Sequence, residues 1–394
     1  MLPRKDKFDL PEGLIYLDGN SLGPLPKGAL ARAETVIREQ WGQQLIRAWN
    51  SAGWMELPVK VGDRLAPLIG APKGSVATGD TLSIKVYQAL AAALKMRPER
   101  KVILSDSGNF PSDLYMAQGL IETIGGDLSL KTPAPEAVID AIDETVAVFM
   151  LTHVDYRTGR LHDMRAITEA AHRVGAVMVW DLAHSAGAMA LDVEGCGAEF
   201  AVGCTYKYLN GGPGAPAFIY ARPDLIDAVE PALAGWMGHD APFAMDPNYR
   251  PARDAERLRV GTPPIVQLSI LDAALDAWDG VDMQALRQAS MRLSDLFITE
   301  VERRCPALTL ASPRDANQRG SQVSFAFEHG YAAVQALIDL GVIGDFRAPN
   351  IMRFGFTPLF LDEDDIRKAA ALIERVIRDE LWRDPKYQTR SRVT

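Results

Sequence analysis

The stretch CTYKYLNGGPGAP, residues 204–216, places one lysine between two tyrosines at the end of an apolar run. The residues before it, AEFAVG (198–203), have the composition of a short buried strand. The glycines and the proline at 211–214 prevent a strand or a helix from continuing. Lys207 is therefore predicted to lie at a strand end that faces a loop, which is where α/β proteins bind ligands. Taken alone, such a lysine is more often an ordinary solvated cation.

The segments around this stretch alternate between strand and helix patterns from residue 74 to residue 220. TVAVFML (145–151) and AVMVWD (176–181) are continuous apolar runs, and the amphipathic segment DMRAITEAAHRV (163–174) separates them. Apolar strands that alternate with helices are typical of a mostly parallel sheet covered by helices on both faces. The predicted fold class is α/β, with this sheet in the larger domain.

The C-terminal part has a different pattern, typical of a smaller α+β domain. SQVSFAF (321–327) alternates as a half-exposed antiparallel strand would, and IMRFGF (351–356) is a second strand. Long helices are predicted over 263–280, 283–304 and 362–381. At 394 residues the chain has room for two domains. We expect three parts. Residues 1–50 form an N-terminal arm and helix that pack with the small domain, residues 51–262 form the large domain, and residues 263–394 form the small domain.

Composition and charge narrow the class of function. The formal net charge of −9 disfavours nucleic acid or an anionic membrane as the main partner. No apolar stretch approaches the ~20 residues that span a bilayer, and the N-terminus lacks the apolar core of a signal peptide. The three cysteines form no CxxC pair, and no metal-ligand spacing is visible, so no metal site is predicted. We expect a soluble cytoplasmic protein.

Two polar residues follow the apolar strand in VMVWDLAHSAG (177–187). Asp181 ends the strand, so it is predicted to lie in the mouth of the sheet. A buried carboxylate there needs a cationic partner, for example a protonated ring nitrogen. The alternatives are a helix N-cap for Asp181 and a hydrogen-bonded structural role for His184.

Two further segments carry features of a ligand site. In ATGDTLSIK (77–85), a glycine turn gives way to a helix that begins near Leu82 and Ser83, and its free N–H groups can bind an anion. In SDSGNFPSDLY (105–115), Phe110 could cover a flat ring by stacking, and Asp113 could be an acid at the helix start or a partner of a residue that contacts the ligand. Helix capping and core packing are the simpler alternatives.

These parts together match the needs of pyridoxal phosphate (PLP). Its pyridinium nitrogen needs an acidic partner, its phosphate needs N–H groups, and its aldehyde forms a Schiff base with a lysine. These groups, and an aromatic cover for the ring, follow in order along one predicted α/β domain: the helix start at Leu82, Phe110, Asp181 and Lys207. No GxGxxG or GxxxxGK[ST] motif competes with this interpretation.

The chain resembles the kynureninase family of fold-type I PLP enzymes over nearly its whole length. The motifs that carry the resemblance are DGNSLG, FPSD, THVDYRTG, WDLAHSAG, TYKYLNGGPGAPAF, GW, GTPPI and the late arginine in MRFGF. The resemblance implies hydrolysis of L-kynurenine to anthranilate and L-alanine, in tryptophan catabolism. It also implies a homodimer. Thr262 stands where some relatives carry asparagine, so the preference between kynurenine and its 3-hydroxy form stays open, with plain kynurenine favoured.

The resemblance also implies a role for each matching residue. Lys207 would be the Schiff-base lysine, and Tyr206 would bind the phosphate and donate a proton. Arg353 would bind the substrate's α-carboxylate. The other implied cofactor contacts are Asp181 at the pyridinium with His184 beside it, Leu82 and Ser83 at the phosphate, Phe110 on the ring, Asp113 and Thr152 along the cofactor, and Trp236 and Thr262 reaching a neighbouring subunit's cofactor.

Three other interpretations remain open. An aminotransferase would use the same lysine, aspartate and arginine. A cysteine desulfurase needs a late nucleophilic cysteine on a mobile loop, whereas the last cysteine, Cys305, ends a predicted helix. A non-catalytic PLP or amino-acid sensor often lacks the lysine or carries a DNA-binding extension, and neither feature is seen. Trp49 and Trp54 could approach the substrate ring or simply pack.

Overall fold

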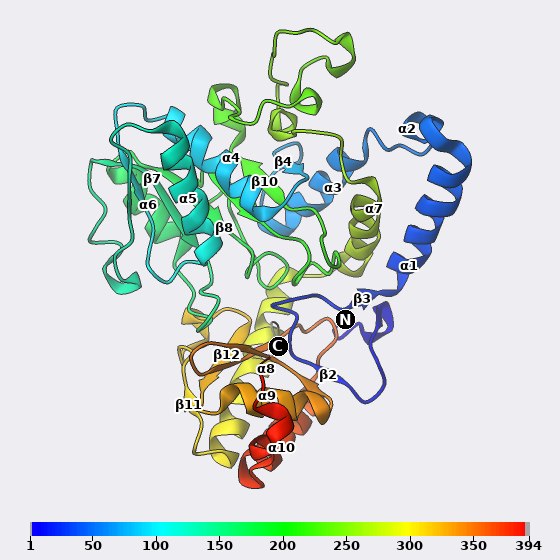
Figure 1. Ribbon diagram of the computed structural model, residues 1–394, viewed down its shortest axis with the longest axis vertical. Coiled ribbons are helices and arrows are strands. Elements are labelled where there is room, and N and C mark those ends of the chain that lie inside the picture. Colours follow the sequence, from blue (N-terminus) through cyan, green and yellow to red (C-terminus); the bar gives the residue numbers. More distant parts are fainter. Residues whose placement is uncertain (1, 391–394) are drawn as a thin grey trace.

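A seven-stranded sheet forms the centre of the upper layer in Figure 1, which shows the computed structural model, described over residues 2–390. Four neighbouring pairs are parallel, and one strand near the edge runs antiparallel to both of its neighbours. This confirms the predicted mostly parallel sheet. In spatial order the strands are β4 (Val76–Thr78), β10 (Phe218–Ala221), β9 (Phe200–Gly203), β8 (Val177–Asp181), β7 (Val146–Thr152), β5 (Val102–Leu104) and β6 (Ser129–Lys131).

Helices cover both faces of this sheet, because each central strand is apolar on both sides. On one face α4 (Leu82–Lys95) contacts α5 (Pro111–Ile124) and the central strands. On the other face α6 (Met164–Arg173) packs on β8, and the Asp163 carboxylate caps its first turn by accepting from the Ala166 N–H at 3.0 Å. Alternate residues of one strand therefore enter two different cores, each closed by its own helices.

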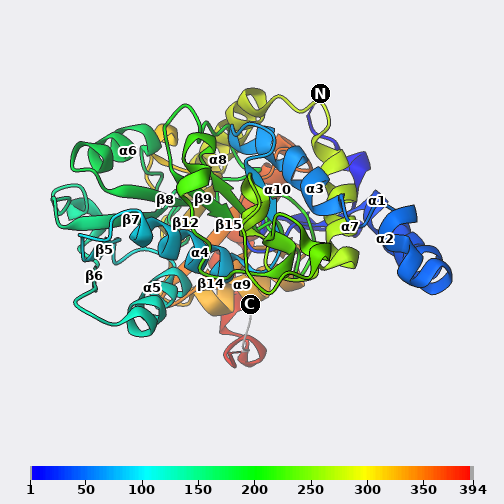
Figure 2. The same ribbon diagram turned by 90° about the horizontal axis from the view of Figure 1, so that it is seen from above.

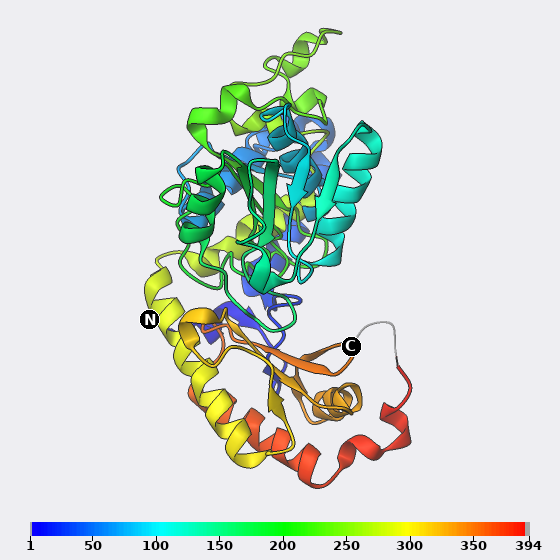
Figure 3. The same ribbon diagram turned by 90° about the vertical axis from the view of Figure 1, so that its left-hand side faces the viewer.

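The lower layer is built on a four-stranded antiparallel sheet, in the order β11 (Thr309–Leu310), β12 (Gln322–Ala326), β15 (Ile351–Gly355) and β14 (Asp345–Arg347). Figure 3 shows this layer from the side, with its long helices beneath the sheet. They are α8 (Met283–Arg304), α9 (Gly330–Asp339) and α10 (Glu363–Arg378). The expectation of a half-exposed strand at 321–327 is wrong, because four of the five residues of β12 are buried.

The N-terminal arm connects the two layers. Its strand β2 (Ile15–Tyr16) pairs in parallel with β13 (Val342–Ile343) of the lower layer. A few residues later, the Gly23 N–H donates to the Tyr206 carbonyl at 2.8 Å. A Cβ at Gly23 would lie only 2.4 Å from the Lys207 carbonyl oxygen, so only glycine permits this close approach. The segment 18–23 is therefore fixed between the small sheet and the lysine loop.

The predicted long helix after the arm is present, but its hydrogen-bonding pattern changes along its length. It comprises α1 (Lys27–Glu34), a π-helical segment η2 (Thr35–Gln44), a short turn η3 (Leu45–Arg47) and α2 (Ala48–Ser51). Figure 2 shows these segments projecting away from the body. At its base α1 packs on α7 (Ile265–Ala274), which in turn contacts α3 (Leu57–Leu65). The domain limits at residues 50 and 262 stay predictions. No helix within 2–390 is long and apolar enough to cross a membrane.

Candidate active site

Lys207 lies just beyond the end of β9, in the loop that the sequence predicted. Its Nζ is 2.9 Å from the Nε2 atom of His184, which follows β8. The same nitrogen is 5.9 Å from the ring centroid of Phe110 and 5.7 Å from that of Tyr206. The fold thus brings together four predicted site residues from three separate segments around one amine.

Two buried carboxyl groups lie next to this amine. Asp181 is the last residue of β8, and its Oδ1 accepts from the Ala183 N–H at 2.8 Å. Asp113 comes from the first turn of α5, and its Oδ2 is buried without a partner. Burial and then the Asp181 charge raise the pKa of Asp113, whereas burial raises the pKa of Asp181 against the opposing charge of Lys207. The two carboxyl groups have one cation nearby, the Lys207 ammonium, and they can accommodate a second positive charge.

His184 is buried and uncharged at neutral pH. Burial, followed by the positive charge of Lys207, holds its pKa well below the usual histidine range. Its Nδ1 is buried without a hydrogen-bond partner, while Nε2 contacts the lysine. A neutral imidazole can accept a proton from a lysine ammonium or donate to the free amine, so it suits a lysine that changes its protonation state.

Two helix N-termini meet beside these groups. Helix α4 begins at Leu82 after a turn in which Asp80 has a φ of 54°, and its N-cap residue Thr81 makes no side-chain capping bond. The hydroxyl groups of Ser83 in α4 and Ser112 in α5 lie 3.0 Å apart, which ties the two helix starts together. Free N–H groups, two helix dipoles and hydroxyls provide a place for a phosphate.

The remaining cofactor-facing residues predicted within one chain lie around the same centre. Thr152 ends β7 directly opposite Asp181 of β8. Phe110 is 41% exposed, and Tyr156 contacts its ring edge-on at 5.2 Å. Burial, and then the neighbouring Cys204, raise the pKa of Tyr206, so its phenol keeps its proton at neutral pH.

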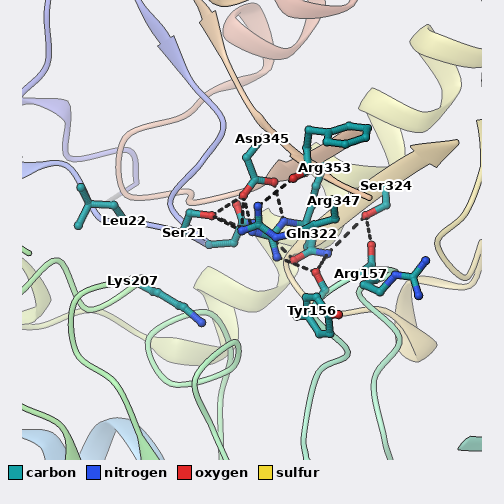
Figure 4. Close-up of polar contacts among 12 residues, drawn as sticks. Ser21, Leu22, Tyr156, Arg157, Lys207, Gln322, Ser324, Asp345, Arg347 and Arg353 are labelled. Carbon is teal, nitrogen blue, oxygen red and sulfur yellow. Dashed lines mark hydrogen bonds and ion pairs between the residues drawn. The ribbon is translucent and has the colours of Figure 1, made fainter. Parts of the chain in front are cut away.

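Arg353 lies in a cluster of charged and polar groups above the lysine (Figure 4). It is on β15, opposite Asp345 of β14, and it is 1% exposed. Its Nε donates to Asp345 Oδ1 at 2.7 Å, and its Nη2 donates to Asp345 Oδ2 and, at 2.7 Å, to the Ser21 hydroxyl. Its Nη1 donates to the Tyr156 carbonyl at 2.6 Å. Figure 4 shows Lys207 extending from the large layer toward the same region.

Sequence reasoning missed the partners of Arg353. Asp345 is eight residues away on a neighbouring strand, and Ser21 is more than three hundred residues away in the arm. GDFR (344–347) places an acidic and a basic residue on one side of a short strand, and DGNSLG contains the serine. Neither segment indicates which strand it lies beside, so no local signal identified the contacts of Asp345 and Ser21 with Arg353.

Two predicted cofactor contacts lie away from this centre. Trp236 is half-exposed and contacts the Phe243 ring edge-on at 5.7 Å. Thr262 is exposed just before α7. Within residues 2–390 no hydrogen bond or ring contact joins either residue to Lys207, so their roles stay predictions.

Trp49 and Trp54 contact each other edge-on at 5.6 Å, and the Trp54 indole N–H donates to the Gln40 side chain at 2.9 Å. Trp54 belongs to a small apolar cluster with Val36 and Ala48. Their observed contacts are therefore those of packing at the junction of η2 and α2.

Comparisons with known proteins match the whole chain. Residues 286–373 match the family model described as the kynureninase C-terminal domain. A kynureninase of Pseudomonas fluorescens is 49% identical, and one of Burkholderia pseudomallei strain 1106a is 50% identical; each match covers 100% of this chain and 96% of the relative. Among solved structures, C-DES with glycine covalently linked to its PLP cofactor superposes with a TM-score of 0.83 at 17% identity, over 94% of this chain and 99% of that one. That likeness confirms the fold-type I architecture.

Proposed function

The chain belongs to the kynureninase family, and we propose from this that it hydrolyses L-kynurenine to anthranilate and L-alanine with PLP attached at Lys207. The observation that carries the proposal is the position of the Lys207 amine. It contacts the neutral His184 imidazole and lies beside the buried carboxyl groups of Asp181 and Asp113. An aminotransferase, a desulfurase or a non-catalytic binder is not favoured, because the full-length relatives at half identity are kynureninases.

The residues present fit this cofactor. Asp113 Oδ2 and His184 Nδ1 are buried and unpartnered, so the site contains polar atoms that a bound group would satisfy. Asp181 would hold the ring nitrogen, Phe110 would cover the ring, and Thr152 would lie along it. The N-termini of α4 and α5, with Leu82, Ser83 and the Tyr206 phenol, would hold the phosphate. When bound, the cofactor supplies an aldehyde for Lys207 and a protonated ring that accepts electrons.

The chain's own groups then handle the protons. Lys207 would remove the substrate's Cα proton, and His184 Nε2, 2.9 Å from Nζ, would share the proton that Nζ gains or loses. Tyr206 keeps its proton at neutral pH, which suits a donor to the alanine carbon that forms when the Cβ–Cγ bond breaks. The carboxylate of Asp181 would favour the protonated form of the ring nitrogen when the cofactor is bound.

We expect the purified protein with PLP to convert L-kynurenine into equal amounts of anthranilate and L-alanine. Anthranilate is followed by its fluorescence, and alanine is quantified alongside it. The value of kcat/KM is expected to be higher for L-kynurenine than for 3-hydroxy-L-kynurenine. Pyruvate in place of alanine, or turnover that requires an amino-group acceptor, would indicate an aminotransferase and contradict the proposal.

We further propose that two copies of this chain form the active unit. The projecting segments α1 to α2 expose large apolar side chains, with Trp41 59% exposed and Ile46 76% exposed. Trp236 and Phe243 present a second exposed apolar surface in a separate loop. Exposed apolar surface of this kind is typical of a protein interface. In such a dimer Trp236 and Thr262 would reach the cofactor of the other copy.

Replacing Ile46 with glutamate is expected to dissociate this dimer, because a carboxylate would have to be buried in an apolar contact. Light scattering after size-exclusion chromatography should then give a molecular mass close to 43.0 kDa in place of twice that value. Ile139→Glu is the matched control, since Ile139 is 50% exposed in a loop elsewhere. A wild-type protein that is monomeric at the same concentration would refute the dimer.

The cellular setting is also a proposal. The three cysteines are free, and two of them are buried. Unpaired buried thiols are typical of a reducing compartment. We therefore propose a cytoplasmic location, and with a net charge of −9 we expect neither nucleic acid nor an anionic membrane as a partner.

A further inference from the structure

An open cavity of about 770 Å³ lies where the two layers meet. The upper layer supplies His153, the start of α6 and the segment 189–192, and the lower layer supplies α8 and the short helix η11 (Ala316–Gln318). Figure 3 shows α8 extending from the lower layer toward the upper one. None of the residues assigned above to the cofactor or the substrate lines this cavity, so it is separate from the candidate active site. Its volume is in the range of small-molecule binding sites.

Arg287 of α8 lines this cavity with a guanidinium that is held in place but has no anionic partner. Its Nη2 donates to the Ala316 carbonyl at 2.8 Å and to the Arg319 carbonyl at 2.6 Å. Its Nη1 is buried and makes no hydrogen bond within residues 2–390. In the same part of the chain no carboxylate forms an ion pair with Arg287. The guanidinium therefore has unused donor capacity at a fixed position.

The charges around Arg287 do not balance. Burial, followed by the positive charge of Arg319, lowers the pKa of Arg287 to about 10, so the guanidinium is still charged at neutral pH. The carboxylate of Asp295 attracts it, but that carboxylate is already in contact with Arg319 at 2.6 Å. One carboxylate thus serves two cations. A buried charge without a partner is unfavourable, and an anion bound in the cavity would provide the partner.

The carboxylates that line the cavity are already in use. Asp163 caps α6 by accepting from the Ala166 N–H at 3.0 Å, where the positive end of the helix dipole also stabilises it. Asp192 Oδ2 lies 3.5 Å from Arg165 Nη2. Neither carboxylate forms an ion pair with Arg287, so neither takes the place of an anionic ligand.

The rest of the cavity wall favours a flat ring. Met164, Met189 and Met291 line it from three separate segments. Methionine side chains adapt to the shape of a ligand, and their sulfur atoms make favourable contacts with the edges of aromatic rings. Amide side chains on α8 and η11 add hydrogen-bond donors and acceptors; they are Gln284, Gln288, Asn317 and Gln318. Together with a guanidinium, which suits a carboxylate, these groups match an aromatic acid.

The back of the cavity lies behind the cofactor site. His153 lines the cavity and directly follows Thr152, the last residue of β7. Its backbone N–H donates to the Asp181 carbonyl at 2.8 Å, and its ring contacts the Trp180 ring edge-on at 5.7 Å. Successive residues of an extended chain point to opposite faces, so a ligand in the cavity would contact the reverse side of the strand ends that carry Thr152 and Asp181.

We propose that this cavity binds a small aromatic carboxylic acid, with its carboxylate on Arg287, its ring against the three methionines and any polar ring substituent on the amides of α8 and η11. The site is separate from the proposed active site, so the inference does not depend on the proposed function. Binding makes and breaks no covalent bond. A ligand at this position would contact both layers and would oppose their relative movement.

The test uses 4-bromobenzoate with the PLP-loaded protein, in crystals and in solution. Anomalous diffraction from the bromine should place it in the cavity, against the methionines. In titration calorimetry, Arg287→Met should weaken binding of 4-bromobenzoate about 10–100-fold, as expected for the loss of a charge-assisted hydrogen bond. The uncharged 4-bromobenzamide should bind Arg287→Met and the wild type equally. Arg314→Met is the matched control, since Arg314 is exposed and pairs with Glu302.

Three results would overturn the inference. Bromine found at Lys207 and not in the cavity would mean that the acid binds in the active site alone. An affinity for 4-bromobenzoate that Arg287→Met leaves unchanged would mean that this guanidinium holds no carboxylate. A bromine peak without measurable heat in solution would mean binding at crystal concentration only.

A second variant keeps the test decisive if Arg287→Met does not fold. Gln288 is exposed on α8 and lines the same cavity, so Gln288→Trp should fill the cavity while Arg287 keeps its contacts. Binding of both bromine compounds should then be lost together, and unchanged binding of both would contradict the site. None of these measurements depends on turnover, so failure of the proposed function would leave their interpretation unchanged.

Discussion

Replacing Lys207 with alanine is expected to lower turnover of L-kynurenine by more than about 10⁴-fold, the upper end for loss of one proton-transfer group. The effect should exceed that of an ordinary general base, because the same amine is proposed to attach the cofactor as well. The visible absorption of the lysine–cofactor adduct should disappear as well. The measurement is anthranilate formation, together with borohydride reduction and mass mapping of the peptide that contains residue 207.

Lys85 provides the matched control, because it is a buried lysine in α4, the helix whose N-terminus is proposed to hold the phosphate. Its Nζ is bonded to Asp80 Oδ2 at 3.0 Å, to Gln88 Oε1 at 3.0 Å and to the Leu258 carbonyl at 3.1 Å. An amine with three fixed partners is not free to attack an aldehyde. Lys85→Gln should keep the adduct even where it lowers stability. The site assignment is wrong if the adduct survives in Lys207→Ala and is lost in Lys85→Gln.

The large sheet could be predicted from the sequence because its signal is local. A strand buried on both faces is apolar at nearly every position, and β7 and β8 show this in every residue before their last, Thr152 and Asp181. The exposure of β12 could not be predicted in the same way. Its serine and glutamine have the pattern of a solvent-facing side, but they lie against the arm and the 156–158 turn. Gln322 accepts from Asn20 at 3.3 Å and donates to the Tyr156 carbonyl at 3.0 Å, and Ser324 donates to the Arg157 carbonyl at 2.6 Å. In a sequence, polar residues that are buried between two layers cannot be distinguished from polar residues on the surface.

The candidate site likewise contains residues that local sequence patterns identify and residues that they do not. Asp181, Phe110 and Lys207 each follow a recognisable strand or precede a recognisable helix, so their placement at one sheet edge follows from the fold class. Arg353 has no local signal, and the resemblance to a family supplied it. Its partner Asp345 depends on the register of β14 against β15, which pairs the two residues directly. Ser21 depends on where the arm crosses the molecule. The register between β14 and β15 and the path of the arm are features of the tertiary structure, and local residue patterns do not predict them.

The arm gives the two halves of the site a physical connection. Its segment 18–23 contacts the arginine cluster through Ser21 and the lysine loop through the Gly23 N–H, 2.8 Å from the Tyr206 carbonyl. A shift of the small sheet therefore acts directly on the backbone beside Lys207. One short segment therefore connects the arginine cluster of the lower layer to the lysine loop of the upper layer.

Replacing Asp181 with asparagine is expected to lower kcat by about 10²–10³-fold, the scale for removing one preorganised electrostatic group from an active site. Asparagine fits the same space but cannot keep the ring nitrogen protonated, so the cofactor loses its capacity to accept electrons. Turnover is measured at saturating PLP, which separates this effect from weaker cofactor binding. Asp181→Glu, which keeps the charge, should retain more activity than Asp181→Asn.

The same change should have the opposite sign on the stability of the cofactor-free protein. Burial raises the folded-state pKa of Asp181 and Asp113, so the stability present at low pH is lost as pH rises through those folded values. An asparagine never ionises, so it avoids this loss, and the melting temperature at neutral pH should rise without PLP and rise less with it.

Glu199→Gln is the control: Glu199 is a buried carboxyl on the same sheet, but it pairs with His172 at 2.8 Å and Arg222 at 3.4 Å. Removing that paired charge should destabilise the protein and leave kcat nearly unchanged, because Glu199 lies one residue before β9, at the opposite end from Lys207. If Asp181→Asn instead behaves like Glu199→Gln, Asp181 is a structural carboxylate and not the partner of the cofactor.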